Sequence, residues 1–208
     1  MIGTMDTPDT TTSTPRYASL QHPLLIIVRG MYGSGKSYLA TRLHTAFGED
    51  AVVVLDPDTI DRDSQEYKDH SAAQTTQGAD AAIHPYRFLQ HKAFQGISDH
   101  KIIIWNQPFT NLEMFKRMIG RLEDYAAKAH TTLPMLVVEV SIDPAIAQAR
   151  VTERQAAGGN SISDAVFAQR LSEYTSFASE GYNIVAVRGD DDVATSVTTV
   201  MRRAAELI

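Results

Sequence analysis

An apolar run that leads straight into a glycine-rich loop constrains the fold of this chain more than any other feature. Residues 24–29 read LLIIVR and residues 30–37 read GMYGSGKS, which fits the pattern Gly-x-x-x-x-Gly-Lys-Ser/Thr. The apolar run predicts a buried strand, and the residues from Lys36 onward predict a helix. Glycines at such a junction allow a tight turn whose backbone N–H groups point inward at the helix N-terminus. The junction therefore predicts an anion-binding loop, which we call the glycine-rich loop.

The side chains of the glycine-rich loop indicate which anion it holds. Lys36 is placed to reach the β- and γ-phosphates of a nucleoside triphosphate, and the Ser37 hydroxyl is placed to bind Mg²⁺. A plain turn between a strand and a helix would require neither residue. We expect ATP to contact Gly30, Gly33, Ser34, Gly35, Lys36, Ser37 and Tyr38.

Short apolar runs alternate with longer helical segments along the rest of the chain. The predicted strands are residues 24–28, 51–55, 101–105, 135–141 and 184–187. The predicted helices are residues 36–47, 64–73, 86–97, 111–130, 144–157, 163–180 and 192–207. Runs that are apolar on both faces are typical of parallel strands covered by helices on each side. The sequence therefore predicts an α/β fold, a three-layer α/β/α sandwich around a five-stranded parallel sheet.

Composition sets limits on organisation and partners. The 208 residues fit one domain over residues 22–208. Residues 1–21 are rich in Thr, Ser, Pro and Asp, so we expect a disordered tail and no signal peptide. The longest apolar run is far shorter than the roughly 20 residues of a membrane helix, so we expect a cytoplasmic protein without membrane contact.

The residue counts exclude several chemistries. The chain has no cysteine, which excludes disulfides, thiolate catalysis and cysteine zinc sites. The formal net charge of −6 argues against binding to long nucleic acids, while a local basic site could still hold one phosphorylated ligand.

An acidic pair follows the second predicted strand. The strand runs into Asp56-Pro57-Asp58, and ligands of open α/β sheets bind at the carboxyl ends of the strands. A carboxylate at this place could accept the proton of an attacking hydroxyl, and Asp56 could also contribute to a Mg²⁺ site. The alternative is an Asp-Pro turn in which an acid caps a short helix.

With the glycine-rich loop and this acidic pair, the chain resembles the P-loop kinase superfamily. Within it, the chain is similar to zeta-toxin kinases, chloramphenicol phosphotransferase-like enzymes and polynucleotide 5′-hydroxyl kinases. The resemblance implies a P-loop NTPase fold of the nucleoside-monophosphate-kinase type that uses ATP and Mg²⁺. It implies that an Asp beyond the second strand activates the acceptor hydroxyl, and the spacing favours Asp58 over Asp56. An antitoxin-like partner follows from the resemblance alone.

Two arginines precede a second glycine-rich segment. Arg150 and Arg154 are four residues apart, on one face of a predicted helix, and residues 158–161 (GGNS) follow. Such a segment suits a lid around residues 150–170 that supplies positive charge over phosphates, as the resemblance also implies. Arg170 is a weaker candidate. A solvated helix face with Glu153 as ion-pair partner is the alternative.

The acceptor side is less defined. Arg87 could pair with an anionic acceptor and Tyr86 could stack on it. The favoured alternative is that Tyr86, Phe88 and Phe94 form the core side of a helix. The third predicted strand ends in Asn106 where many P-loop enzymes have an acid, and Asn106 could hold a metal-bound water or contact the acceptor. Thr110 is a further candidate contact, and Asn111 either joins it or caps the next helix.

These residues favour an ATP-dependent kinase that phosphorylates a hydroxyl of a small nucleotide-like or sugar-like acceptor. Lys36, Asp58, Arg150 and Arg154 are its candidate catalytic residues. The sequence has no guanine-reading Asn-Lys-x-Asp element of a GTPase, and no acidic third-strand end as in a mechanical ATPase of the AAA type. The alternatives left open are a P-loop ATPase, a nucleotide-binding regulator without an acceptor, and a degenerate kinase.

Overall fold

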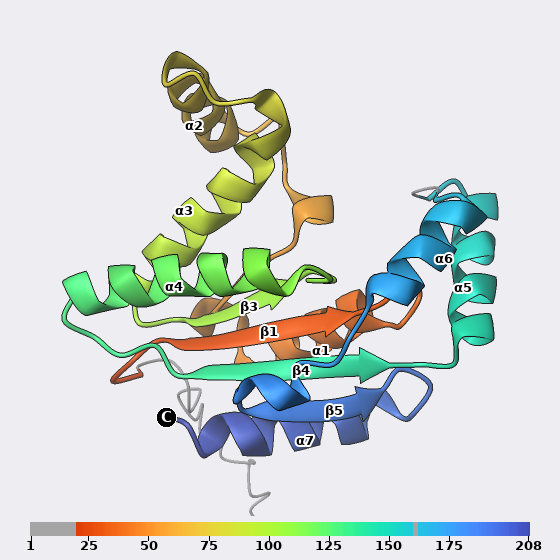
Figure 1. Cartoon of the computed structure of the whole chain (residues 1–208). Coiled ribbons are helices and arrows are strands. Elements are labelled where there is room, and N and C mark those ends of the chain that lie inside the picture. Colours follow the sequence, from red (N-terminus) through yellow and green to blue (C-terminus); the bar gives the residue numbers. More distant parts are fainter. Residues whose placement is uncertain (1–19, 160–161) are drawn as a thin grey trace, which may run out of the picture.

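The sheet carries the architecture expected from the sequence. The computed structural model describes residues 20–159 and 162–208, and within them one parallel sheet has the strand order β2-β3-β1-β4-β5 (Figure 1). The strands are β1 (Leu24–Gly30), β2 (Val52–Leu55), β3 (Ile102–Asn106), β4 (Met135–Ser141) and β5 (Ile184–Arg188). The predicted three-layer α/β sandwich with five parallel strands is confirmed.

Helices cover both faces of the sheet. They are α1 (Lys36–Phe47), α2 (Gln65–Thr76), α3 (His84–Ser98), α4 (Leu112–Lys128), α5 (Pro144–Ala156), α6 (Asp164–Glu173) and α7 (Val193–Ala205), with 3-10 turns η1 (Glu49–Ala51), η2 (Pro57–Thr59), η3 (Ala81–Ile83) and η4 (Ala178–Glu180). Helices α1 and α7 pack on one face, and α3 and α4 pack on the other. The order of elements is that of repeated β-α-β crossovers between parallel strands.

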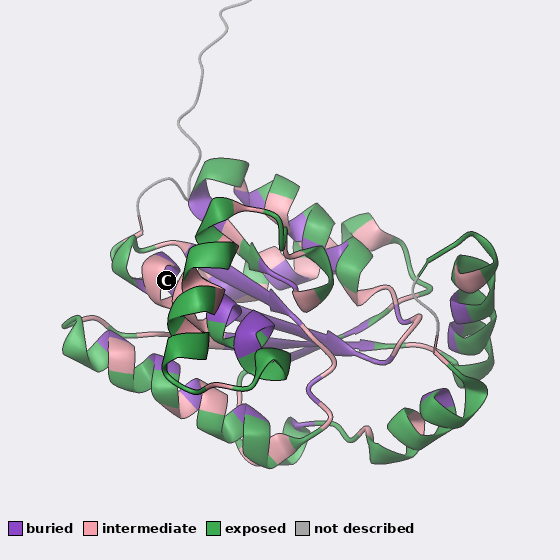
Figure 2. Cartoon of the chain, turned by 90° about the horizontal axis from the view of Figure 1, so that it is seen from above, coloured by how far each residue is buried: buried purple, intermediate pink, exposed green. Residues whose placement is uncertain are grey.

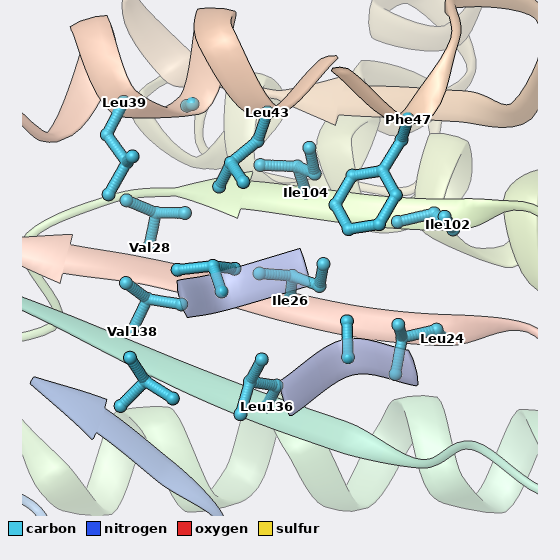
Figure 3. Packing of buried hydrophobic residues seen from close by; sticks show 14 of the residues in the cluster. Leu24, Ile26, Val28, Leu39, Leu43, Phe47, Ile102, Ile104, Leu136 and Val138 are labelled. Atoms are coloured by element: carbon cyan, nitrogen blue, oxygen red, sulfur yellow. The ribbon is translucent and has the colours of Figure 1, made fainter. Parts of the chain in front are cut away.

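The central strand β1 is buried on both faces. Its even-numbered residues Leu24, Ile26 and Val28 pack against α1, where Leu39 and Leu43 lie over the sheet (Figure 3). Its odd-numbered apolar residues face α3 and α4. Every residue of β1 is buried, so the strand fixes the position at which the next segment, the glycine-rich loop, leaves the sheet.

Two helix pairs project beyond the sheet. Helices α2 and α3 rise on one side, and α5 and α6 stand at the carboxyl ends of the strands (Figure 1). Seen from above, exposed residues dominate α5 and α6, while the central strands β1 and β3 are buried (Figure 2). The expected tail, residues 1–21, lies outside the described residues up to residue 19, and the segment 158–161 does so at residues 160–161. No helix among the described residues is long and apolar enough to cross a membrane.

Most helix boundaries follow from local capping. Side chains of Ser64, Asn111 and Ser163 accept backbone N–H bonds at the starts of α2, α4 and α6, as capping residues do. Asn111 therefore caps α4, which is one of the two roles predicted for it. The predicted helix over residues 163–180 is wrong at its end, because α6 stops at Glu173 and Tyr174 is extended. The following residues turn into the core instead of continuing the helix.

Candidate functional site

The glycine-rich loop joins β1 to α1 and is held by close backbone packing. Gly33 and Gly35 have φ angles of 76° and 91°, which side chains other than glycine rarely adopt. A Cβ on Gly33 would lie 2.3 Å from the Ala147 carbonyl oxygen of α5. A glycine is therefore needed at position 33, where α5 packs against the loop.

A second close approach comes from the loop that follows β5. A Cβ on Gly189 would lie 1.7 Å from the carbonyl oxygen of Ser34. The Ser34 side chain is fully buried, and its hydroxyl has no hydrogen-bond partner. Sequence reasoning missed Gly189, because the need for glycine arises from a residue 155 positions away in the sequence.

Lys36, the first residue of α1, stands among charged groups. Burial lowers the pKa of its ammonium, while the carboxylates of Asp56 and Asp58 act in the opposite direction. The positive charge of Arg154 also lowers the pKa of Lys36. The structure therefore brings together four residues that the sequence singled out separately.

An amide bridges the start of α1 and the end of β2. Asn106 Nδ2 donates to Ser37 Oγ at 2.9 Å and to Asp56 Oδ2 at 2.5 Å. Asp56 Oδ1 in turn accepts the backbone N–H of Asp58 at 2.9 Å. The Asn106 Oδ1 atom is buried without a hydrogen-bond partner. Because β3 lies between β1 and β2 in the sheet, Asn106 is placed to connect them.

A cavity of about 600 Å³ lies over the glycine-rich loop. The loop and α1, both predicted lid arginines and the β5–α7 connection contribute to its lining, which is Gly33, Gly35, Lys36, Ser37, Tyr38, Leu39, Val140, Arg150, Arg154, Val187, Arg188, Gly189, Asp190, Asp191, Asp192, Val193 and Ser196. Arg150 Nη1 donates to the carbonyl oxygens of Gly189 at 3.1 Å and Gly33 at 3.4 Å. No ion pair within residues 20–159 and 162–208 joins Glu153 to either arginine.

A second cavity of about 270 Å³ lies on the other side of Asp56. The end of β2, the turn η2 and helices α2 and α3 form it, and its lining is Val54, Leu55, Asp56, Thr59, Ile60, Asp61, Ser64, Glu66, Phe88, Leu89 and Lys92. Lys92 Nζ lies 3.1 Å from Glu66 Oε1. Asp56 thus belongs to the wall of this cavity and to the bridge with Ser37.

The remaining predicted contacts lie apart from both cavities. Arg87 Nη1 donates to Gln74 Oε1 on α2, and neither Arg87 nor Thr110 is among the residues that line a cavity. Arg170 pairs with Glu173 on its own helix at 2.9 Å. Tyr86 is 49% exposed, whereas Phe88 packs inward as the core alternative predicted.

A buried ion pair lies directly before the glycine-rich loop. Arg29 is fully buried at the end of β1, and its Nη1 lies 2.5 Å from Glu139 Oε1 on β4. Arg29 Nη2 also donates to the carbonyl oxygens of Thr175 at 2.8 Å and Phe109 at 3.2 Å. The guanidinium stands 3.6 Å from the centre of the Phe177 ring. One side chain thus holds β4, the loop after β3 and the segment after α6 together.

Glu139 completes this cluster. Its Oε1 accepts the backbone N–H of Phe177 at 2.6 Å, and its Oε2 accepts the Ser176 hydroxyl at 2.6 Å. Buried charges are stable only when paired and hydrogen-bonded. Sequence reasoning missed this pair, although a lone arginine at the end of an apolar run directly before the loop was a signal that could have found it.

Comparisons with known proteins agree with the fold. A family model described as AAA domain matches residues 25–177. No curated protein sequence matches the chain. Among solved structures, a candidate kinase from Chloroflexus aurantiacus is similar with a TM-score of 0.64 at 17% identity, over 88% of this chain and 99% of that chain.

Two further solved structures are similar to this chain over most of its length. A gluconokinase from Sinorhizobium meliloti has a TM-score of 0.53 at 15% identity, over 90% of this chain and 95% of that chain. A chain of the PezAT toxin–antitoxin system of Streptococcus pneumoniae has a TM-score of 0.56 at 12% identity, over 91% of this chain and 88% of that chain. At these identities the likeness shows the fold alone, and the predicted P-loop NTPase fold is confirmed.

Proposed function

The chain belongs to the AAA domain family AAA_33, and we propose that it is an ATP- and Mg²⁺-dependent kinase for a hydroxyl of a small molecule. The observation that carries the proposal is the position of Asp56, which is bridged to Ser37 by Asn106 and also lines the second cavity. A nucleotide site and a separate acceptor cavity therefore meet at one carboxylate. A kinase requires this adjacency, whereas an ATPase without an acceptor does not.

In this proposal the first cavity holds ATP. The backbone N–H groups of the glycine-rich loop and the free N-terminus of α1, which has no side-chain cap, bind the β- and γ-phosphates. Lys36 binds the same phosphates, and triphosphate binding restores the preference for its protonated form that burial weakens. The ribose and base occupy the part of the cavity beside α7.

The residues present fit a Mg²⁺ ion. Ser37 and Asp56 offer the hydroxyl and carboxylate oxygens that this ion prefers, and the unpaired Oδ1 of Asn106 can accept a hydrogen bond from a coordinated water. When bound, Mg²⁺ offsets negative charge on the β- and γ-phosphates. The described residues hold no group of three His, Cys, Asp or Glu that could bind a metal by themselves, which suits an ion that binds together with the nucleotide.

Asp58 is the proposed general base. Its backbone N–H is fixed on Asp56, and its side chain is exposed and close enough to Lys36 to influence its pKa. In the reaction, Asp58 accepts the proton of the acceptor hydroxyl as that oxygen forms a bond to the γ-phosphorus, and the bond between the γ-phosphorus and the bridging oxygen to the β-phosphate breaks to release ADP.

The helices α5 and α6 act as a lid in this proposal. Arg154 lines the nucleotide cavity and stabilises negative charge that develops on the transferred group. Arg150 holds Gly33 and Gly189 together through their carbonyl oxygens, so part of its role is to maintain the loop. Removing the charge of Arg154 is expected to lower turnover more than nucleotide affinity.

The test follows phosphoryl transfer with three variants. A metabolite extract is incubated with the protein and ATP, and mass spectrometry detects compounds that gain one phosphoryl group. We expect Lys36→Ala and Asp58→Asn to reduce product formation on the order of 10²-fold or more. Asp63→Asn is the matched control, because the Asp63 carboxylate is 99% exposed on the same connection and, unlike those of Asp56 and Asp58, is not among the charges that act on the Lys36 ammonium.

The alternative is a P-loop ATPase or nucleotide-binding regulator. It is favoured if ATP hydrolysis by Asp58→Asn equals that of the parent protein and no phosphorylated product forms from any acceptor. A degenerate kinase is excluded if the parent protein shows turnover that Lys36→Ala abolishes.

A further inference from the structure

The second cavity has an apolar floor beneath a charged rim. Leu55 and Leu89 are almost fully buried, and Phe88 is 7% exposed. The floor offers contact area to the carbon skeleton of a ligand. The rim decides which charges such a ligand can carry.

Carboxylates outnumber cations on the rim. Among the described residues that line the cavity, Asp56, Asp61 and Glu66 carry carboxylates, and Lys92 carries the one ammonium. That ammonium lies within hydrogen-bond distance of both Glu66 oxygens, at 3.1 and 3.3 Å. The cation of the rim is therefore already paired, and both oxygens of Asp56 already accept hydrogen bonds. Among the described residues of the rim, Asp61 is the carboxylate that is left to interact with a ligand.

The hydroxyl donors of the rim are already in use. The Thr59 hydroxyl donates to the Asp56 carbonyl oxygen at 3.3 Å, and the Ser64 hydroxyl donates to the Asp61 carbonyl oxygen at 2.7 Å. By contrast, the Asp61 carboxylate accepts one backbone N–H on its Oδ1 atom, that of Asp63 at 3.0 Å, and its Oδ2 atom remains available. The groups that remain for a ligand are thus acceptors and anions, so the ligand must bring the hydrogen-bond donors.

The cation that the sequence offered for an anionic acceptor lies elsewhere. The Arg87 guanidinium is bound to Gln74 on the neighbouring helix and does not line the cavity. A phosphate or carboxylate on the acceptor would meet Asp61 and Glu66 without a free counter-charge, and it would also approach the triphosphate of ATP. Like charges that close in a partly desolvated site repel one another.

From these contacts we infer that the acceptor is a polyol or amino alcohol that bears no phosphate or carboxylate group. Its hydroxyls donate to Asp61, and an amine on it is stabilised by the same carboxylate. The inference rests on the proposed kinase function and narrows the acceptor of that same site. It removes nucleotides and sugar acids from the candidate acceptors.

The test separates acceptors by charge before any is identified. A metabolite extract is divided by ion exchange into cationic, neutral and anionic pools, and each pool is incubated with the full chain and ATP. We expect phosphorylated product from the cationic or neutral pool. Product from the anionic pool alone overturns the inference and leaves the kinase function standing, whereas no product from any pool contradicts the kinase function itself.

A charge variant checks that the second cavity is responsible. With the acceptor so found, Asp61→Asn is expected to raise KM at least tenfold for an amine-bearing acceptor while kcat changes less than threefold. Asp63→Asn, two residues away and outside the cavity, is expected to leave both values unchanged. Equal KM values for Asp61→Asn and the parent protein overturn the assignment of the acceptor to this cavity.

Discussion

The two sides of the proposed kinase site, the nucleotide side and the acceptor side, are built by different means. On the nucleotide side, the close contacts are between backbone segments: Gly33 packs against Ala147, and Gly189 packs against Ser34. On the acceptor side, α2 has no buried residue and is attached to α3 through side chains, with the Tyr67 and Phe88 rings 5.2 Å apart. The nucleotide side cannot change without moving the main chain. The acceptor side can change one side chain at a time, so acceptor preference can diverge while the nucleotide site stays.

Gly189→Ala is expected to have the largest effect, since it breaks the backbone contact of the nucleotide side. Its Cβ would overlap the Ser34 carbonyl oxygen at 1.7 Å, and backbone cannot move aside as a flexible side chain can. We expect the free energy of unfolding to fall by about 5 kcal/mol and ATP affinity to fall at least a hundredfold. Chemical denaturation and isothermal titration with ATP measure the two effects.

Gly120→Ala is the matched control. A Cβ at Gly120, inside α4, meets no atom within 4 Å. Alanine is the better helix former by about 1 kcal/mol, so this variant is expected to be slightly more stable and to bind ATP as the parent does. Equal behaviour of the two variants contradicts the backbone-contact account of the nucleotide side.

The same contrast explains what the sequence could predict. The requirements of the glycine-rich loop are local, since its strand, its positive φ angles and the start of α1 lie within 24 consecutive residues (24–47). The predicted bounds of α1 and β4 agree with the structure residue by residue. Strands that are apolar on both faces can also be recognised from the sequence without knowledge of the strands beside them.

Features that depend on distant contacts could not be predicted. Helix α6 ends at Glu173 because Arg29 and Glu139 hydrogen-bond to the backbone of Thr175 and Phe177 directly after it. The local sequence by itself predicts that the helix continues. The bridge from Asn106 to Ser37 and Asp56 depends on the order of strands in the sheet. Arg87 is predicted near the acceptor from its place in the chain after the second strand, whereas the hydrogen bond of its side chain to Gln74 decides where the charge lies.

The buried ion pair between Arg29 and Glu139 provides a second test of the comparison between the nucleotide side and the acceptor side. Arg29→Met leaves Glu139 buried without its cation, and loss of one partner of a buried pair costs about 3–5 kcal/mol. We expect a loss of that size in denaturant unfolding. The double variant Arg29→Met, Glu139→Gln is expected to recover part of it, because an amide needs no counter-charge. Identical stability of the single and double variants contradicts a role for the charge of Glu139.

The pH dependence of stability provides a smaller effect from the same cluster. Burial raises the pKa of the Tyr174 hydroxyl to about 12, against the nearby positive charge of Arg29, which lowers it. The unfolded chain releases this proton near pH 10, so the stabilisation is complete below pH 10 and is lost as the pH rises to about 12. Two pKa units correspond to about 2–3 kcal/mol.

Comparison with Tyr174→Phe isolates this effect from the titration of lysines. Unfolding free energies of both proteins are measured from pH 8 to 12. We expect the variant to lose about 2–3 kcal/mol less than the parent over this range. Parallel curves for the two proteins would show that Tyr174 titrates as an ordinary exposed tyrosine.

The smallest expected effect on stability lies on the acceptor side. Lys92 and Glu66 join α3 to α2 across the rim of the second cavity, with side chains 32% and 49% exposed, and exposed ion pairs contribute about 0–1 kcal/mol. Lys92→Met is therefore expected to change the unfolding free energy by less than about 1 kcal/mol and to leave ATP affinity unchanged, because Lys92 does not line the nucleotide cavity.

The same substitution removes the partner of Glu66, so the rim becomes more negative, and the KM of an amine-bearing acceptor is expected to fall. Denaturation, titration with ATP and acceptor kinetics on one preparation separate the three effects. A loss of ATP affinity in this variant would mean that the two sides of the site are mechanically coupled and that the acceptor side is not free to vary independently.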